Sequence, residues 1–389
     1  MEELILGELT ERKIGYGIVQ PGESTIGGIP VIKVNNIISG LKSIQDLDTT
    51  RPENDQKYRK TRLNGGEIII SVVGTIGKTA IVPMNFKGCN LVRATALIDI
   101  KDSILSRWVK YYIDSPKGQS YINGNLNTTV QPTLNIKSLV EMPIPFYGRE
   151  YAEKVVTILS KIDDKIENNR KINDNLEQQA QALFNYFFVD HINELGDYHE
   201  GSLTDIASYL NGLAMQKFRP EGTDRGLPVL KIKELGQGFC DSSSDRCSSY
   251  IKDDYVINNG EIIFSWSGTL LVDFWCAGKC GLNQHLFKVT SDDYPKWFIY
   301  FWTKHHLDQF IRIAKDKAVT MGHIKRSELD NANVLIPSTK KLDQIGATIA
   351  PMIDKLINNR VEMMELSSLR DSLLPKLMSG ELKINEIDC

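Results

Sequence analysis

The chain has 389 residues, of which 41% are hydrophobic and 24% charged, an ordinary composition for a protein with folded domains. Its formal net charge of −3 excludes a surface that is basic throughout, but leaves room for one positive face that binds nucleic acid. The sequence shows neither a signal peptide nor a run of about 18 apolar residues, so we expect no membrane span and a cytoplasmic location.

Residues 1–148 are predicted to form a strand-rich globular domain. Two short runs of β-branched residues, 29–34 and 67–73, are bounded by Gly, Pro and Asn, which is typical of strands. Residues 105–113 carry apolar side chains on one helical face, and a second short helix is predicted to begin near Ile136. Residues 142–145 are expected to close the domain.

Residues 149–195 form the second predicted segment, a long amphipathic helix. Apolar and amide side chains step alternately by four and three residues, as in the a and d positions of a coiled coil. The seam consists of Val155, Leu159, Ile162, Ile166, Asn169, Asn173, Leu176, Ala180, Leu183 and Phe187. Gly and Pro are absent from residues 151–190, so one helix of roughly 40 residues, about 60 Å long, is predicted.

Residues 196–338 repeat the plan of the first domain. Strands are predicted at 227–232 and 261–266, and one helix at 297–310. Matching segments lie 198 residues apart near the first strand and 194 apart near the second, as if two copies of one unit had collected loops of different length. A period this long is a whole domain plus a helix, which excludes a solenoid repeat.

Residues 339–389 repeat the helical seam, and every member lies 190 residues after its counterpart. The second seam consists of Ile345, Ile349, Met352, Leu356, Asn359, Met363, Leu366, Arg370, Leu373 and Leu377. Pro351 lies inside this pattern where the first copy has Lys161, so a bend or a helix start is expected there.

The two seams are predicted to pack against each other in antiparallel fashion, because each exposed apolar stripe must be covered and a parallel pair would crowd both domains at one end. Asn169 and Asn359 would then meet in the middle and specify the register of the pair. The alternatives are that both amides face water, or that the seams form a homodimer contact.

Several segments resemble the DNA-specificity subunit of type I restriction–modification systems. Residues 369–382 (LRDSLLPKLMSGEL) are similar to the C-terminal conserved segment of that family, and residues 162–170 with 182–188 to its central conserved helix. The segments Gly66-Glu67-Ile68-Ile69 and Gly260-Glu261-Ile262-Ile263 resemble the core of its target recognition domains.

This resemblance implies an α+β fold with two similar target recognition domains, separated by a long antiparallel two-helix coiled coil, and a pseudo-two-fold internal repeat. The domains would be 1–148 and 196–338, with the central conserved helix at 149–195 and the C-terminal conserved helix at 339–389. It also implies that two methyltransferase subunits dock on the chain and that restriction subunits join the full complex.

The sequence lacks the motifs of catalysis. Gly77-Lys78-Thr79 resembles the end of a P-loop, but a P-loop also requires glycine five residues before Gly77, and that position is occupied by Val72. The corresponding segment of the second copy has no lysine. The histidines form no His-x-x-x-His pair, and Cys276 and Cys280 lack zinc-ribbon spacing, so buried free thiols are favoured over a zinc site. Asp163 and Asp164 are expected on a solvated helix face. We expect no catalytic residue, metal or cofactor, and catalysis in partner subunits.

Double-stranded DNA is the predicted ligand, because basic and amide side chains on domain loops contact phosphates and base edges. The candidates in the first domain are Arg12, Lys13, Tyr16, Lys33, Asn35, Lys78, Arg93, Asn127, Thr128, Thr129 and Gln131. Those in the second are Lys217, Arg219, Lys231, Lys233, Lys279, Asn283, Gln284, His285, Lys317, Thr320 and His323. Different loops on shared strands predict two different half-sites, hence a bipartite asymmetric target.

Two other functions are compatible with these patterns. The chain could serve a methylation-only or other phage-defence complex, using the same residues. It could also be a structural coiled-coil adaptor that binds protein at both ends, in which case DNA binding that weakens steeply with salt would be absent.

Overall fold

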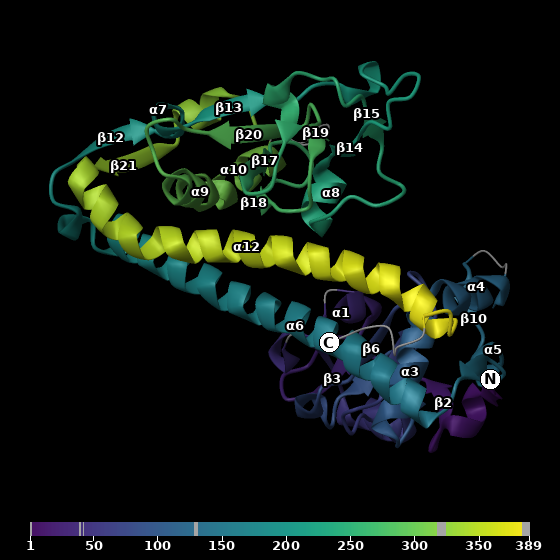
Figure 1. The fold of residues 1–389 in the computed structure, drawn as a ribbon. Coiled ribbons are helices and arrows are strands. Elements are labelled where there is room, and N and C mark those ends of the chain that lie inside the picture. The colour runs from purple at the N-terminus through teal and green to yellow at the C-terminus, as the bar shows by residue number, and fades with distance from the viewer. Residues whose placement is uncertain (1, 39, 42, 128–130, 317–323, 383–389) are drawn as a thin grey trace. The chain divides into compact units, whose positions relative to one another are not determined.

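The computed structural model describes residues 2–38, 40–41, 43–127, 131–316 and 324–382 (Figure 1). The chain divides into two compact units. The first comprises Met1–Asp163 with Ser368–Cys389, and the second comprises Asp164–Ser367. Each unit holds one globular domain and one stretch of each long helix.

The globular domain of the first unit is built on small sheets. An antiparallel sheet has the strand order β2 (Arg12–Tyr16), β8 (Thr95–Asp99), β5 (Ile68–Ser71), β6 (Thr79–Ile81). A second sheet has the order β4 (Asp48–Thr50), β3 (Ile29–Ile32), β7 (Asn90–Leu91), and its β3–β7 pair is parallel. Two further pairs are β1 (Glu2–Ile5) with β11 (Pro143–Phe146), and β9 (Leu126–Asn127) with β10 (Thr133–Leu134). The helices are α1 (Val34–Ile38), α2 (Pro52–Lys57), α3 (Ser103–Asp114), α4 (Pro116–Gly124) and α5 (Ile136–Val140).

The second unit repeats this topology. Its antiparallel sheet has the order β13 (Ser208–Asn211), β20 (Leu286–Thr290), β17 (Glu261–Ser265), β18 (Leu271–Trp275). The other sheet has the order β15 (Arg246–Cys247), β14 (Leu227–Leu230), β19 (Cys280–Leu282), β16 (Val256–Ile257), again with a parallel β14–β19 pair. The strand β12 (Tyr198–Ser202) pairs with β21 (Asn333–Pro337) as β1 pairs with β11. The helices are α7 (Leu203–Ile206), α8 (Ile232–Gln237), α9 (Lys296–His305), α10 (Leu307–Asp316) and α11 (Ser327–Asp330). The shared strand order confirms the internal repeat.

The structure corrects several predicted element boundaries. The first predicted strand ends at Ile32 and is followed by α1. Residues 143–146, expected only to close the domain, form β11 and pair with the N-terminal strand β1. The single helix predicted at 297–310 is wrong: α9 ends at His305, and α10 follows. This break matches the one between α3 and α4 in the first unit.

The long helices α6 (Arg149–Asn185) and α12 (Thr339–Met378) pack side by side in each unit (Figure 1). In the first unit Tyr151, near the start of α6, donates a hydrogen bond of 2.9 Å to the carbonyl of Leu377, near the end of α12. In the second unit Asn359 Nδ2 lies 2.9 Å from Asn173 Oδ1. The early part of one helix therefore meets the late part of the other, which confirms antiparallel pairing.

Pro351 does not begin a helix, because α12 runs unbroken from Thr339. The expected helix start is therefore wrong, whereas a change of direction near the N-terminal end of α12 is visible in Figure 1. Proline has no amide hydrogen, so the carbonyl of Ala347, four residues before Pro351, lacks its helical hydrogen bond. Both Ala347 and Pro351 are exposed. Water can satisfy that carbonyl, which explains why the helix tolerates the proline.

The buried face of α6 departs from the predicted seam near the C-terminal end of the helix. Phe184 and Phe188 are buried, whereas the predicted seam residues Leu183 and Phe187 are only half-buried. The Phe184 ring stacks on Phe188 at 5.0 Å and on Phe301 of α9 at 5.4 Å between centroids. Here α6 packs on the globular domain rather than on α12 alone, and a π-helical turn at Tyr186–Asp190 ends it.

Candidate nucleic-acid interface

The first domain has a surface cleft of about 370 Å³ at the ends of its strands. Arg93, which follows β7, and Gln131, which precedes β10, contribute polar groups to its lining. The Arg93 side chain is exposed. The rest of the lining is mostly apolar and consists of Ile18, Val19, Pro21, Val73, Val92, Ala94 and Thr133. A cleft with a mostly apolar lining and one exposed guanidinium suits the edge of a base or the sugar–phosphate backbone.

The second domain has a cleft of about 330 Å³ beside β14 and β15. Three cationic side chains and one carboxylate line it: Arg219, Lys231, Arg246 and Asp245. Arg246 is held in place by its Nε, which donates 2.7 Å to the carbonyl of Arg225. The excess of positive groups makes this cleft a reasonable site for phosphate.

An ion pair occurs at the same place in both domains. Lys33 lies 2.5 Å from Asp48 in the first domain, and Lys231 pairs with Asp245 in the second. In each pair the lysine follows the central strand of the small sheet and the aspartate lies on or beside the neighbouring strand. The hydrogen bond from the lysine lowers the pKa of Asp48 and of Asp245. Each lysine is therefore partly neutralised within its own domain.

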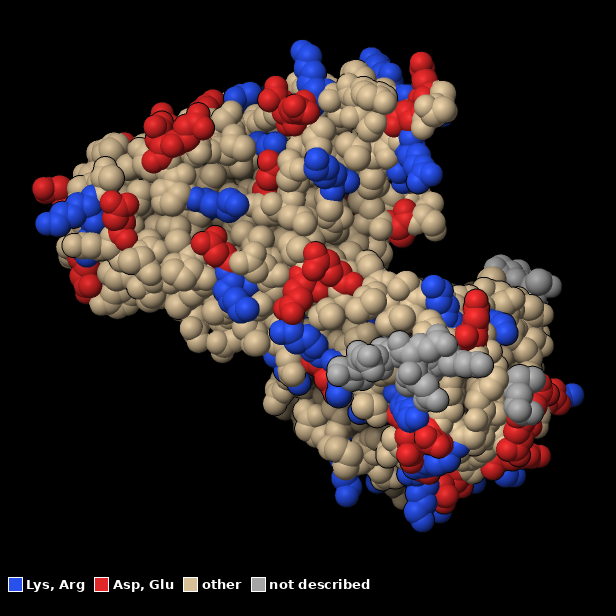
Figure 2. Space-filling view, in the orientation of Figure 1, with Lys and Arg blue, Asp and Glu red and all other residues tan. Residues whose placement is uncertain are grey.

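Charges of both signs are mixed on the face of the molecule drawn in Figure 2. Lys and Arg side chains lie over the β14–β15 region of the second unit, with Asp and Glu among them. This pattern agrees with the formal net charge of −3 and limits positive potential on this face to local clusters.

The sequence model of the family described as the type I restriction modification DNA specificity domain matches residues 3–178 and again 196–366. The chain belongs to this family. It is therefore a DNA-recognition component that assembles with other subunits, and the methylation and cleavage activities of type I systems lie in those subunits.

Individual relatives agree with the family. The specificity subunit of the type I restriction enzyme MjaIX of Methanocaldococcus jannaschii is 28% identical over 310 residues, covering 74% of this chain and 71% of the relative. The EcoBI specificity subunit of Escherichia coli is 29% identical over 157 residues, which are 40% of this chain and 33% of that one. The crystal structure of a type I S subunit from M. genitalium matches with a TM-score of 0.56 and 14% identity, over 97% of this chain and 95% of that chain, and so supports the fold.

The clefts of the two target recognition domains bring together only some of the predicted residues. Arg93 and Gln131 share the first cleft, and Arg219, Lys231 and Asn283 share the second. Gln284 and His285 directly follow Asn283, and their side chains lie 3.4 Å apart. Further candidates are exposed on the surface outside these two linings: Lys13, Tyr16, Lys33, Asn35, Asn127, Lys217, Lys233 and Lys279. Thr128, Thr129, Lys317, Thr320 and His323 lie outside the described residues.

Arg12 is committed to contacts inside the first domain. Its guanidinium lies 2.6 Å from Glu67 and 2.5 Å from Asp99, and it donates 2.7 Å to the carbonyl of Arg62. The Glu67 side chain is only 2% exposed. These contacts give Arg12 a structural role in holding β2 to β8 and to the segment that precedes β5.

The P-loop-like segment is a hairpin connection. It joins β5 to β6, whereas a P-loop leads from a strand into a helix. The Ser71 hydroxyl donates 2.6 Å to the carbonyl of Thr75, and the equivalent Ser265 donates 2.8 Å to that of Thr269. Lys78 is exposed and lines a different cleft of the first unit, together with Lys110 and Arg370.

Sequence reasoning missed or misplaced three residues. Arg246 and Gln216 line the second cleft. Arg246 lies on β15, which pairs with β14 as β4 pairs with β3 in the first domain, so the repeat was the signal that could have found it. Asp163, expected on a solvated face, accepts 2.8 Å from the Tyr111 hydroxyl and 3.0 Å from Arg370. For Asp163 that expectation is wrong, because α3 and α12 pack over this face of α6 in the first unit, whereas Asp164 is exposed as expected.

Among the described residues, no group of His, Cys, Asp and Glu has the geometry to hold a metal ion. The described cysteines are free, and burial raises the pKa of Cys89 and Cys276 to about 11, so both stay protonated at neutral pH. No helix in the described ranges is long and apolar enough to cross a membrane.

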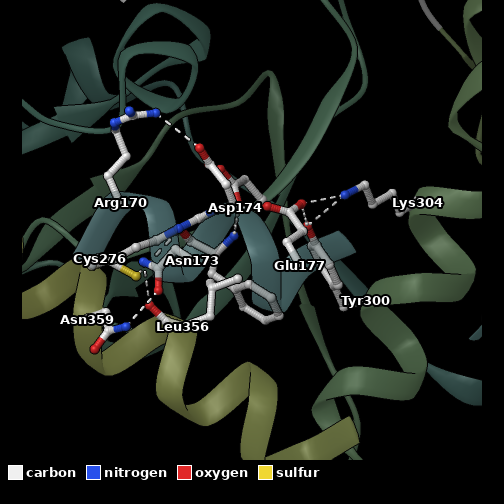
Figure 3. A network of polar contacts seen from close by, with 12 residues as sticks. Arg170, Asn173, Asp174, Glu177, Cys276, Tyr300, Lys304, Leu356 and Asn359 are labelled. Carbon is white, nitrogen blue, oxygen red and sulfur yellow. Dashed lines mark hydrogen bonds and ion pairs between the residues drawn. The ribbon is translucent and has the colours of Figure 1, made fainter. Parts of the chain in front are cut away.

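The second unit contains a buried amide network between its helices (Figure 3). Asn169, Asn173 and Asn359 are all buried. Asn173 accepts from Asn359 and donates 3.2 Å to the carbonyl of Leu356, while Asn169 donates 2.7 Å to Glu362. The alternative that these amides face water is wrong, and Asn169 and Asn359 bond to different partners rather than to each other.

A charged junction anchors the second target recognition domain to both helices. Glu177 of α6 lies 2.5 Å from Lys304 of α9 and 3.5 Å from Arg360 of α12 (Figure 3). Arg360 in turn lies 2.5 Å from Asp273 of β18. Burial opposes the ionisation of Glu177, but the two cations beside it lower its pKa. The carboxylate therefore stays charged and ties three elements of the unit together.

We predict that Arg12→Met destabilises the first domain by roughly 3–5 kcal/mol, because it leaves the buried Glu67 carboxylate without its cation. Lys13→Met removes the same charge from the next, exposed residue and should change stability by less than about 0.5 kcal/mol. Urea unfolding of the full chain measures both. Equal stability of the two variants would contradict the structural role of Arg12.

Proposed function

We propose that this specificity subunit recognises a bipartite, asymmetric DNA target, with one half-site for each target recognition domain. The supporting observation is the repeat itself: two domains have the same strand order but carry different side chains in and around their clefts. Shared strands with different loops favour two readers of different specificity.

We infer that the paired helices set the spacing between the half-sites. The 37 residues of α6 and the 40 of α12 correspond to helices about 55 and 60 Å long. Two domains that bind the same face of B-DNA contact half-sites about 34 Å apart or at multiples of that distance. Helices of this length are sufficient to connect two domains that bind half-sites at this spacing.

We assign the register of the helices to the amide network. A buried polar residue at a coiled-coil position favours the one alignment that satisfies its hydrogen bonds. Asn173 joins Asn169 and Asn359 in this role, because it bonds to α12 through both its amide oxygen and its amide nitrogen.

The partners we propose are two methyltransferase subunits, with restriction subunits joining the full complex in the cytoplasm. The support is the repeated helical segment, which presents two similar surfaces and so suits two copies of one partner. This leaves open the methylation-only alternative, in which the nuclease is missing.

Sequencing of methylated sites in cells with and without this chain tests the function. We expect one methylated motif that depends on the chain and consists of two unlike half-sites with a gap of fixed length. A single continuous motif, or methylation that does not change when the chain is deleted, contradicts the proposal. A protein-binding adaptor predicts the second outcome.

The spacing role predicts that removing one heptad from each helix shortens the gap. Residues 164–170 and 361–367 are a suitable pair, since Asn169 and its partner Glu362 leave together. The deletion removes about 10 Å of helix, equivalent to about three base pairs. Both half-site sequences should persist in the methylated motif. Altered half-sites with an unchanged gap would refute the proposal that the helices set the spacing.

The register role predicts that Asn173→Leu combined with Asn359→Leu gives a chain that is at least as thermally stable but no longer a single species. Leucine side chains can pack in several registers of the two helices, whereas the hydrogen bond between the two amides forms in only one. Light scattering on the purified chain measures the oligomeric states. Exposed Asn175→Leu with Asn358→Leu is the matched control. A single unchanged species in the first variant would exclude the register role.

A further inference from the structure

The two target recognition domains can be aligned residue by residue at the segment that follows the parallel strand. In the first domain this segment is residues 92–94, after β7, and in the second it is residues 283–285, after β19. The amide of Val92 donates 3.2 Å to the carbonyl of Ile32, and the amide of Asn283 donates 3.2 Å to that of Leu230. These bonds place the two segments equivalently beside their central strands.

The neighbouring backbone shows the same match. Ile18 donates 2.7 Å to Leu91, as Leu213 donates 3.0 Å to Leu282. The amide of Val72 bonds to the carbonyl of Ala94 at 2.8 Å, as the amide of Trp266 does to that of His285 at 3.4 Å. The match pairs Arg93 with Gln284, Ala94 with His285, and Val72 with Trp266.

Two glycines show that the backbone itself is held closely at this position. A Cβ on Gly17 would lie 2.2 Å from the carbonyl of Leu91, and a Cβ on Gly212 would lie 2.2 Å from the carbonyl oxygen of Asn283. Neither distance is sterically possible, so both domains need glycine here. The backbone therefore follows a similar path in both copies, although the tightest contact is with Leu91 in the first and with Asn283, the counterpart of Val92, in the second.

Those side chains have different hydrogen-bonding chemistry. Arg93 is exposed, lines the first cleft and offers a forked donor. Gln284 offers one donor group and one acceptor. Its Oε1 is buried without a hydrogen-bond partner among the described residues, so the side chain must turn outward before that oxygen can meet a base. The indole of Trp266 lies 6.2 Å from the exposed His285 ring and donates 3.1 Å to Asn211. The His285 ring therefore neighbours both the Trp266 indole, 6.2 Å away by ring centroid, and the Gln284 amide, 3.4 Å away by nitrogen.

We propose that this matched position reads one base pair in each half-site, and that Arg93 reads guanine where Gln284 reads adenine. Arginine donates twice to O6 and N7 of guanine, whereas glutamine accepts from N6 and donates to N7 of adenine. A contact to a base, unlike a contact to phosphate, specifies sequence. This inference rests on the proposed reading of two half-sites and names the residues that distinguish them.

The test exchanges the two side chains in the full chain, in cells that carry the complete system, and determines the methylated motif. Arg93→Gln should change the preferred base at one position of the first half-site from guanine to adenine, with a roughly ten- to hundred-fold change in preference. Gln284→Arg should do the reverse at one position of the second half-site. The other half-site and the gap should stay unchanged in each variant.

Arg59→Gln is the matched control, because Arg59 is exposed in the same domain and lines neither cleft. Binding of the purified complex to DNA with each base at the affected position separates the two kinds of contact. Uniform weakening on all four sequences would make Arg93 a phosphate contact and overturn the proposal, as would an unchanged motif in a folded variant. A wild-type motif without two half-sites would instead refute the proposed function.

Discussion

The burial of two long helical stripes is the constraint on which the rest of the structure depends. Each stripe carries apolar side chains over many turns, and water would destabilise it if it stayed exposed. In both units the stretches of α6 and α12 cover each other in antiparallel fashion. Pairing two distant segments in this way brings the beginning and the end of the chain into one unit. The fold is therefore closed by contacts of high sequence separation.

Polar groups lie inside the packed helices, and we propose that they specify the register of this pairing. Apolar packing alone tolerates a shift of one heptad, since one leucine-like side chain can replace another. Asn173 and Asn359 satisfy each other only in one alignment, and Arg370 finds Asp163 only in that alignment. The charged junction around Glu177 extends the same principle to the second target recognition domain, because it links that domain to both helices.

Comparison of the two copies separates the residues that both domains need for their fold from the residues that differ between them. Glu67 and Glu261 both accept from the backbone at the start of the same hairpin, and Gly17 and Gly212 permit the same close approach. These residues maintain the domain. The side chains that line the clefts, in contrast, differ between the two domains. This division allows one scaffold to present two different recognition surfaces, as the proposed reading of two unlike half-sites requires.

The sequence alone determined the repeat, the long helices and their antiparallel pairing, because heptad spacing and duplicated motifs are local patterns. Only the tertiary structure decided which side of α6 is buried near Phe184, since that depends on where α9 packs. It also decided that Arg12 faces Glu67 and Asp99, whereas Arg93 faces a cleft. Both arginines look alike in sequence, because the charge of a side chain is a property of the residue, but its partner is a property of the fold.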